Sequence, residues 1–211
     1  MGAITDMMHH PFGNNYFPTE ACGGAPYDAD KRHCFEQRCA GVDSPPADCF
    51  AANVSEIVTQ HGPQEYAVNR LQACAMDVTT ERGEAWYTRY WSFVKCSEDE
   101  YDKTPEAIAA SCSSGANFTD LETAYIATCF GTSAGDASVL REAKATVDHA
   151  GTPTVLVDGK ESSPDSALKD VCAVYTGVKP AGCKITTEQN SWSVWYERAV
   201  EAVEAPTNTL C

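Results

Sequence analysis

Apolar side chains recur every three or four positions through the middle of this chain, roughly from residue 63 to residue 150, and this period is typical of amphipathic helices. Pro63 suits the first turn of the first helix, which carries Leu71 and Ala75 on one face. A second helix is predicted from about Glu84 to Cys96. Its aromatic residues are Trp86, Tyr90, Trp91 and Phe93. The middle of the chain is therefore predicted to be a run of short helices.

Three further helices are predicted from their capping residues. Thr104-Pro105 opens one of them, and Thr119-Asp120-Leu121-Glu122 is a capping box for the next. Asp136 is predicted to cap the last, which reaches Val147. Isolated helices shorter than about 12–15 residues are marginal in water, so packing and disulfides are expected to stabilise these.

The period changes after the helical run. Thr154 to Val157 forms a β-branched apolar strand, Asp158-Gly159 suits a type I′ turn, and the returning strand begins at Lys160. Ser163-Pro164 then supplies the cap and first position of a helix that Gly177 ends. A strand led in by a proline, a hairpin and a helix are predicted here.

The two ends of the chain differ from the middle. Residues 1–50 are rich in Cys, Pro and Gly and lack a helical period, so an extended segment pinned by disulfides is expected. Within it, Pro26 to His33 is too polar for a packed helix, and its basic cluster is expected to solvate a loop. Residues 185–211 form a terminal segment with an amphipathic helix, which packs on its own chain or docks a partner protein. The partner-docking candidates are Trp192, Trp195 and Tyr196.

Charge and hydropathy narrow the classes of function. The net charge of −15 argues against binding to nucleic acid or to an anionic membrane, because both demand clustered positive charge. The chain has no run of 18 apolar residues, so no membrane-spanning helix is expected. The N-terminus lacks a basic region followed by an apolar core, and no signal peptide is expected there.

Eleven cysteines in 211 residues indicate an oxidising compartment, either secretory, lysosomal or extracellular, or another organelle lumen such as the thylakoid lumen. The spacing Cys34-x4-Cys39-x9-Cys49 lacks the paired short spacings of a zinc module, so neither a metal nor another cofactor is expected. An odd total leaves at least one thiol unpaired or paired to another chain, with Cys22 and Cys211 as the candidates. The disulfide candidates are Cys34, Cys39, Cys49, Cys74, Cys96, Cys112, Cys129, Cys172 and Cys183.

Two short patterns add candidate modifications and a candidate short disulfide. Asn53-Val54-Ser55 and Asn117-Phe118-Thr119 are glycosylation sequons, consistent with a secretory route. Cys172 and Cys183 are close enough in sequence for a bridge between a helix and the tail after it. The other pairings cannot be derived from spacing.

The segment from Thr59 to Cys74 resembles the signature C-Q-H-G-x-x-E-C-x-x-N-x-x-x-x-C of the gamma-interferon-inducible lysosomal thiol reductase (GILT) family. Thr59 and Tyr66 stand at the first two cysteine positions of that signature. His61 is expected to be a loop or cap histidine rather than a general base. The matching residues are Gln60, His61, Gly62, Glu65, Asn69 and Cys74.

The hairpin segment from Gly151 to Lys160 is similar to the C-terminal part of the same family. The resemblance covers roughly residues 53–184 and implies an α/β, thioredoxin-like, disulfide-rich fold over residues 51–184, with a helical insertion at about 63–150. In such a fold the proline before the strand is cis and faces the redox cysteines, which makes Pro153 the candidate.

The segment from Glu20 to Ala25 resembles the family's active-site C-x-x-C, with Cys22 retained and Ala25 in place of the second cysteine. A dithiol reductase needs one thiolate to attack the substrate disulfide and a second to resolve the mixed disulfide. Three interpretations remain: a monothiol enzyme, an engineered trap and a pseudoenzyme. The polar segment after the motif favours the last, with Cys22 as a structural half-cystine. We expect a structural or interaction subunit with a protein partner. The alternative is a thiol-disulfide oxidoreductase that reduces disulfide-bonded proteins through Cys22.

Overall fold

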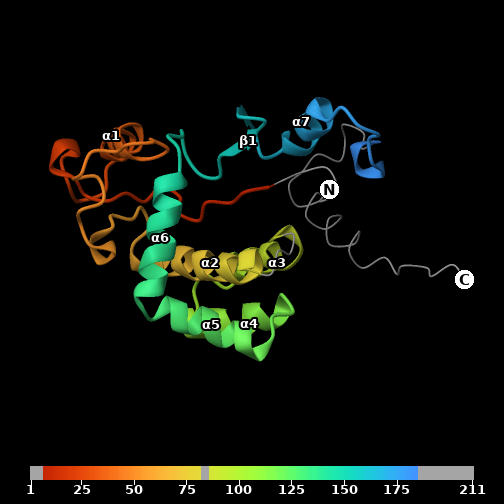
Figure 1. Ribbon diagram of the computed structural model, residues 1–211, viewed down its shortest axis with the longest axis horizontal. Coiled ribbons are helices and arrows are strands. Elements are labelled where there is room, and N and C mark those ends of the chain that lie inside the picture. Colours follow the sequence, from red (N-terminus) through yellow and green to blue (C-terminus); the bar gives the residue numbers. More distant parts are fainter. Residues whose placement is uncertain (1–6, 82–85, 185–211) are drawn as a thin grey trace, which may run out of the picture. The chain divides into compact units, whose positions relative to one another are not determined.

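A computed structural model describes residues 7–81 and 86–184 of the chain (Figure 1). These residues fall into two compact units, which are described separately. The helical unit is Met7–Thr152, and the hairpin unit is the part that begins at Pro153. Within the described ranges, none of the helices combines the length and the apolar character needed to span a membrane.

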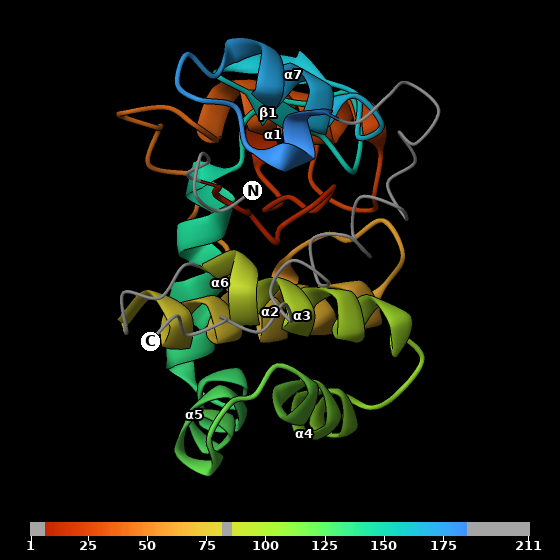
Figure 2. The same ribbon diagram turned by 90° about the vertical axis from the view of Figure 1, so that its right-hand side faces the viewer.

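The predicted run of helices forms the larger part of the helical unit. The central helix α2 packs against α3, α5 and α6, and α4 packs against α3 and α5. Figure 2 shows α4 and α5 side by side as a layer against α2 and α3. The bounds are α2 Pro63–Glu81, α3 Trp86–Asp99, α4 Pro105–Gly115, α5 Asp120–Phe130 and α6 Ser133–Ala145.

A single apolar core holds α2, α3, α4 and α5 together. Leu71 from α2, Tyr90 and Phe93 from α3, Ile108 from α4 and Ile126 from α5 are fully buried in it. Two disulfides cross the same core. Cys74–Cys129 joins α2 to α5, and Cys96–Cys112 joins α3 to α4. Packing and disulfides thus stabilise helices that are short by themselves.

The predicted caps were right in two cases and wrong in one. The Thr104 side chain accepts a hydrogen bond from the Ala107 backbone at the start of α4, and Thr119 and Glu122 form the predicted capping box of α5. Asp136, however, is not a cap. The helix α6 begins three residues earlier, after Thr132, and the Asp136 carboxylate instead forms an ion pair with Arg70.

The N-terminal part contains a helix that the sequence pattern did not predict. Helix α1, Ala29–Cys39, begins where the Asp28 carboxylate accepts hydrogen bonds from the Asp30 and Lys31 backbone amides. It buries Phe35 in a second apolar core. The other aromatic residues of that core include Phe12, Tyr16 and Phe17. The expectation of an extended loop at residues 26–33 was therefore wrong.

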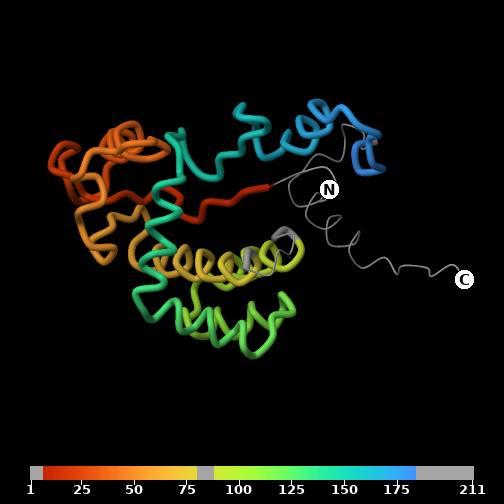
Figure 3. Tube along the Cα trace, viewed as in Figure 1, coloured from red at the N-terminus to blue at the C-terminus, as the bar shows by residue number. Residues whose placement is uncertain are grey.

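The remainder of residues 7–60 is irregular and includes two short 3₁₀ helices, η1 at Glu20–Cys22 and η2 at Val54–Glu56. Figure 3 shows this segment, in red and orange, gathered near the C-terminal end of α6. The amide of Gly41 donates a hydrogen bond to the carbonyl of Lys144 there. The disulfides Cys22–Cys34 and Cys39–Cys49 tie the segment to α1.

The hairpin unit contains the predicted two-stranded ribbon. Strands β1, Val155–Val157, and β2, Lys160–Ser162, pair in antiparallel fashion. The turn residues Asp158 and Gly159 have φ angles of 51° and 73°, and the positive values at both positions match the predicted type I′ turn.

The helix of this unit was predicted with the wrong bounds. Helix α7 spans Ala167–Val174 rather than beginning at Pro164, and the 3₁₀ helix η3 follows at Ala181–Lys184. The predicted Cys172–Cys183 disulfide is present. The described residues are thus mixed α/β and mostly helical, with one two-stranded sheet. A complete thioredoxin-like fold stays a prediction.

Candidate functional site

The signature residues on and before α2 bind the N-terminal segment of the helical unit. The side-chain amide of Asn14 donates a hydrogen bond to Oε1 of Gln60 over 2.5 Å. Nδ2 of Asn69 donates to the backbone carbonyl of Phe12 over 3.3 Å. Two residues of the signature therefore fasten a segment that lies about 50 positions earlier in the chain.

The other signature residues shape the beginning of α2. The backbone amide of His61 donates to Oε2 of Glu65 over 2.7 Å, while the imidazole of His61 is 67% exposed. Gly62 has a φ of 91°, which strongly favours glycine. These positions therefore form a helix start with an exposed histidine.

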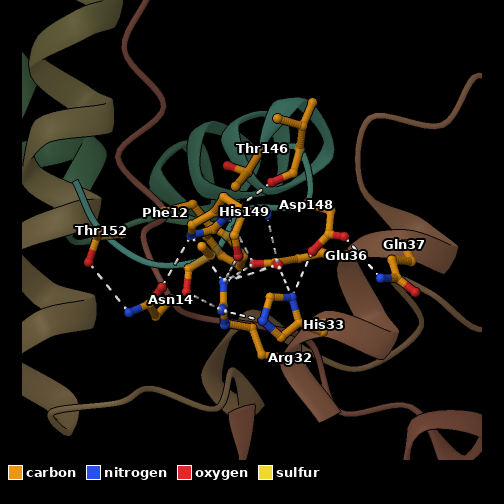
Figure 4. A network of polar contacts seen from close by, with 12 residues as sticks. Phe12, Asn14, Arg32, His33, Glu36, Gln37, Thr146, Asp148, His149 and Thr152 are labelled. Atoms are coloured by element: carbon orange, nitrogen blue, oxygen red, sulfur yellow. Dashed lines mark hydrogen bonds and ion pairs between the residues drawn. The ribbon is translucent and has the colours of Figure 1, made fainter. Parts of the chain in front are cut away.

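Asn14 also belongs to a polar network that joins α1 to the segment after α6 (Figure 4). Its Oδ1 lies 3.1 Å from Nε2 of His149, and its Nδ2 lies 3.4 Å from Oγ1 of Thr152. The centre of the network is a buried ion pair, in which Nη1 of Arg32 donates to both oxygens of Glu36 over 2.9 and 3.1 Å. Their side chains are only 3% and 1% exposed.

The outer side of this network is a histidine and carboxylate pair. Nδ1 of His33 lies 2.8 Å from Oδ1 of Asp148, and Nε2 of Gln37 donates to Oδ2 of the same carboxylate over 3.0 Å. Nη2 of Arg32 lies 3.1 Å from Nε2 of His33. A guanidinium can only donate, so this Nε2 accepts and Nδ1 carries the proton that points to Asp148.

Burial controls the electrostatics of the network. It raises the pKa of Glu36 to about 7, although the charge of Arg32 opposes the effect. Burial also lowers the pKa of His149. Burial acts to raise the pKa of Asp148, but hydrogen bonds from His33 and Gln37 hold that pKa below its usual value. Glu36 is thus a buried carboxyl group that titrates near neutral pH.

The sequence analysis did not predict this network. Arg32 and His33 were expected to solvate a loop, and Glu36, Asp148 and His149 were not singled out. The available signal was the i, i+4 spacing of Arg32 and Glu36 in the helix that Asp28 caps. The same spacing is common in ion pairs on exposed helix faces, so it does not by itself indicate a buried pair.

Residues 47–116 match the family model described as Gamma interferon inducible lysosomal thiol reductase (GILT). The resemblance to GILT is confirmed. The match contains the signature and the helices α2, α3 and α4, but it reaches neither Cys22 nor Pro153. No curated protein and no solved structure gives a significant match.

The residues at the GILT-like active-site segment are not arranged for catalysis by a free thiol. Cys22 is buried, and its sulfur is bonded to that of Cys34. A thiolate is the nucleophile in disulfide exchange, and a sulfur in a disulfide cannot act as one. Of the two interpretations of Cys22, the structure contains the structural half-cystine and not the unpaired nucleophile.

The proline expectation is corrected as well. In the parts of the chain that the structure describes, the cis peptide bond is Ala25–Pro26, and the bond before Pro153 is not cis. Pro153 opens the hairpin unit, while Cys22 belongs to the helical unit.

The other candidate residues divide into three groups. All nine disulfide candidates are bonded, in the pairs Cys22–Cys34, Cys39–Cys49, Cys74–Cys129, Cys96–Cys112 and Cys172–Cys183. Both sequon asparagines, Asn53 and Asn117, are exposed. The remaining candidates lie outside the described residues, namely Trp192, Trp195, Tyr196 and Cys211.

Proposed function

We propose that this chain is a divergent GILT-like protein that does not run a dithiol cycle and serves as a disulfide-stabilised structural or binding subunit in an oxidising lumen. The observation that carries the proposal is the Cys22–Cys34 bond, together with Ala25 at the second position of the motif. GILT family resemblance suggests thiol reductase chemistry, and these residues argue against it at the family's own site.

The chemical reason is the number of free sulfurs. A reductive cycle requires an attacking thiolate and a resolving thiol next to it. Here Ala25 supplies no sulfur, and the Cys22 sulfur is committed to α1. The signature also lacks its first two cysteines, at Thr59 and Tyr66.

The compartment follows from the same bonds. All ten cysteines in the described parts of the chain form disulfides. The thiol buffers of a cytosol keep most cysteines reduced, so these bonds support a secretory, lysosomal, extracellular or other organelle lumen. The exposed sequons at Asn53 and Asn117 support the secretory route.

A binding role is supported by apolar side chains on the hairpin unit. Leu156 on β1 and Val174 at the end of α7 are each 49% exposed, and Val178 is 95% exposed. Exposed apolar area on a small unit favours contact with a protein.

The decisive experiment combines thiol mapping with an activity assay. Non-reduced full-length protein is alkylated and analysed by mass spectrometry, and the reduction of a disulfide-bonded test protein is then measured with and without a dithiol reductant. We expect Cys22 and Cys34 to be unlabelled and the activity to equal that of Cys22→Ser. Activity that is present in the natural chain and lost in Cys22→Ser would overturn the proposal.

A second candidate function is thiol-disulfide exchange through the Cys22–Cys34 pair. The observation that favours it is the partial exposure of Cys34, a property shared by Cys96 and Cys183 in other bridges, whereas both members of Cys39–Cys49 and of Cys74–Cys129 are buried. An external thiolate can reach an exposed sulfur more easily. The variant Ala25→Cys is the positive control, because it restores the C-x-x-C spacing.

A further inference from the structure

Three side chains with metal-ligating atoms converge where α1 meets the segment after α6, in the outer part of the network of Figure 4. Nδ1 of His33 lies 2.8 Å from Oδ1 of Asp148 and 3.7 Å from Oε2 of Glu36. All three ligand atoms lie within 4.8 Å of one another. We propose that His33, Glu36 and Asp148 form a binding site for a divalent transition-metal cation of the Zn²⁺ type.

The spacing of the ligand atoms suits such a cation. Zn²⁺ holds nitrogen and oxygen ligands at about 2.0–2.2 Å, and a tetrahedral arrangement then separates two ligand atoms by about 3.3 Å. The observed separations of 2.8 and 3.7 Å lie on either side of this value. Small changes in these separations are therefore sufficient to admit the cation, once the contact between His33 and Arg32 opens.

The backbone and neighbouring side chains hold the ligands in place. His33 and Glu36 are three residues apart on α1 and thus lie on the same face of the helix. Asp148 is oriented by the amide of Gln37, and Glu36 is oriented by Arg32 from the buried side. Such outer hydrogen bonds are typical of metal sites.

The ligand set also indicates which cation binds. One imidazole with two carboxylates suits Zn²⁺ or Mn²⁺ better than Ca²⁺ or Mg²⁺, which prefer oxygen ligands alone. Glu36 is 1% exposed, but His33 and Asp148 are 36% and 38% exposed, so the cation and a water ligand have access from solvent.

One existing contact must open on binding. A metal at Nδ1 of His33 places the ring proton on Nε2, which then faces the donor Nη2 of Arg32. The partly exposed imidazole turns away, and Nη2 keeps its second acceptor, the carbonyl of Ala150 at 3.3 Å. The nearby His149 is not a ligand in this proposal, because its Nδ1 lies 3.0 Å from the carbonyl of Val147.

The test uses Co²⁺ as a coloured probe and Zn²⁺ as its competitor. The full-length protein is first alkylated without reduction, so that a free Cys211 thiol cannot bind the metal. Titration of Co²⁺ is followed by the visible absorption of the bound ion and by calorimetry. The variants are His33→Ala and Asp148→Asn, both at partly exposed positions. The control is His61→Ala, which removes an exposed histidine 3.5 Å from a single carboxylate, that of Glu65.

We expect one Co²⁺ per chain, displaced by Zn²⁺. Each site variant should weaken binding at least about tenfold, because the loss of an outer partner alone costs about 10–100-fold. His61→Ala should bind like the natural chain. The proposal is overturned if no Co²⁺ binds, if His33→Ala and Asp148→Asn bind normally, or if His61→Ala is weakened as much as they are. Circular dichroism of each variant confirms folding, and Asp148→Asn keeps a hydrogen-bond acceptor if His33→Ala is unstable.

Discussion

The buried carboxyl group of Glu36 makes a specific prediction about how stability depends on pH. Burial raises its pKa from 4.5 to about 7 in the folded protein. Between these two values the folded state holds a proton that the unfolded state releases. The contribution of Glu36 to stability is therefore complete below about pH 4.5 and is lost as the pH rises through about 7.

The size of this effect follows from the gap between the two pKa values. A gap of about 2.5 pH units, at 1.36 kcal/mol per unit, corresponds to roughly 3 kcal/mol of unfolding free energy. The variant Glu36→Gln carries no titrating group at this position but keeps an oxygen that accepts from Arg32. The stability of the natural chain minus that of Glu36→Gln should fall by about 3 kcal/mol between about pH 4.5 and about pH 7.5.

Urea denaturation of both proteins across this pH range measures the difference. The subtraction is necessary because burial also lowers the pKa of His9 from 6.5 to about 4. The contribution of His9 to the stability of the folded protein is therefore lost as the pH falls below 6.5. The variant Glu161→Gln, at an exposed position on β2, controls for the loss of a surface charge. A difference curve that is flat, or that rises with pH, would refute the assignment of a neutral-range proton to Glu36.

Two further predictions concern the disulfides and a helix cap. Under graded reduction of the native protein, the Cys22–Cys34 bridge should open before Cys74–Cys129, because Cys34 is partly exposed and both cysteines of the other bridge are buried. Trapping with alkylating reagents and peptide mapping gives the order in which the bridges open. Simultaneous opening of the two bridges would contradict the argument. In protein made without N-glycosylation, because Thr119 also completes the sequon at Asn117, Thr119→Ala removes the cap of α5 and should lower the unfolding free energy by about 1 kcal/mol in urea. Thr119→Ser, which keeps the hydroxyl, should not. Equal losses in the two variants would contradict the capping argument.

Local signals in the sequence correctly predicted three features in which the deciding contact joins neighbouring residues. The caps at Thr104 and Thr119 and the turn at Asp158-Gly159 were predicted from two to four residues each, and the structure contains them. In such cases the hydrogen bonds and backbone angles that stabilise the element lie within the motif itself.

Helix α1 shows where pattern reasoning fails. A hydrophobic pattern treats Arg32 and Glu36 as solvent-facing, yet both are buried, and Arg32 donates hydrogen bonds to Glu36. Arg32 also donates to the carbonyls of His149 and Ala150, which are 117 and 118 positions away in the sequence. No window along the sequence contains both partners.

The amino-acid sequence by itself determined the resemblance to GILT, the oxidising environment implied by eleven cysteines, and the short capped helices. Only the tertiary structure decided the four disulfide pairings other than Cys172–Cys183, and the contacts that the signature residues make. Cys22 meets Cys34, and Gln60 meets Asn14 across 46 positions, because packing brings these segments together. Spacing along the sequence shows which residues could pair, whereas the pairs that form depend on the distances between them in the folded chain.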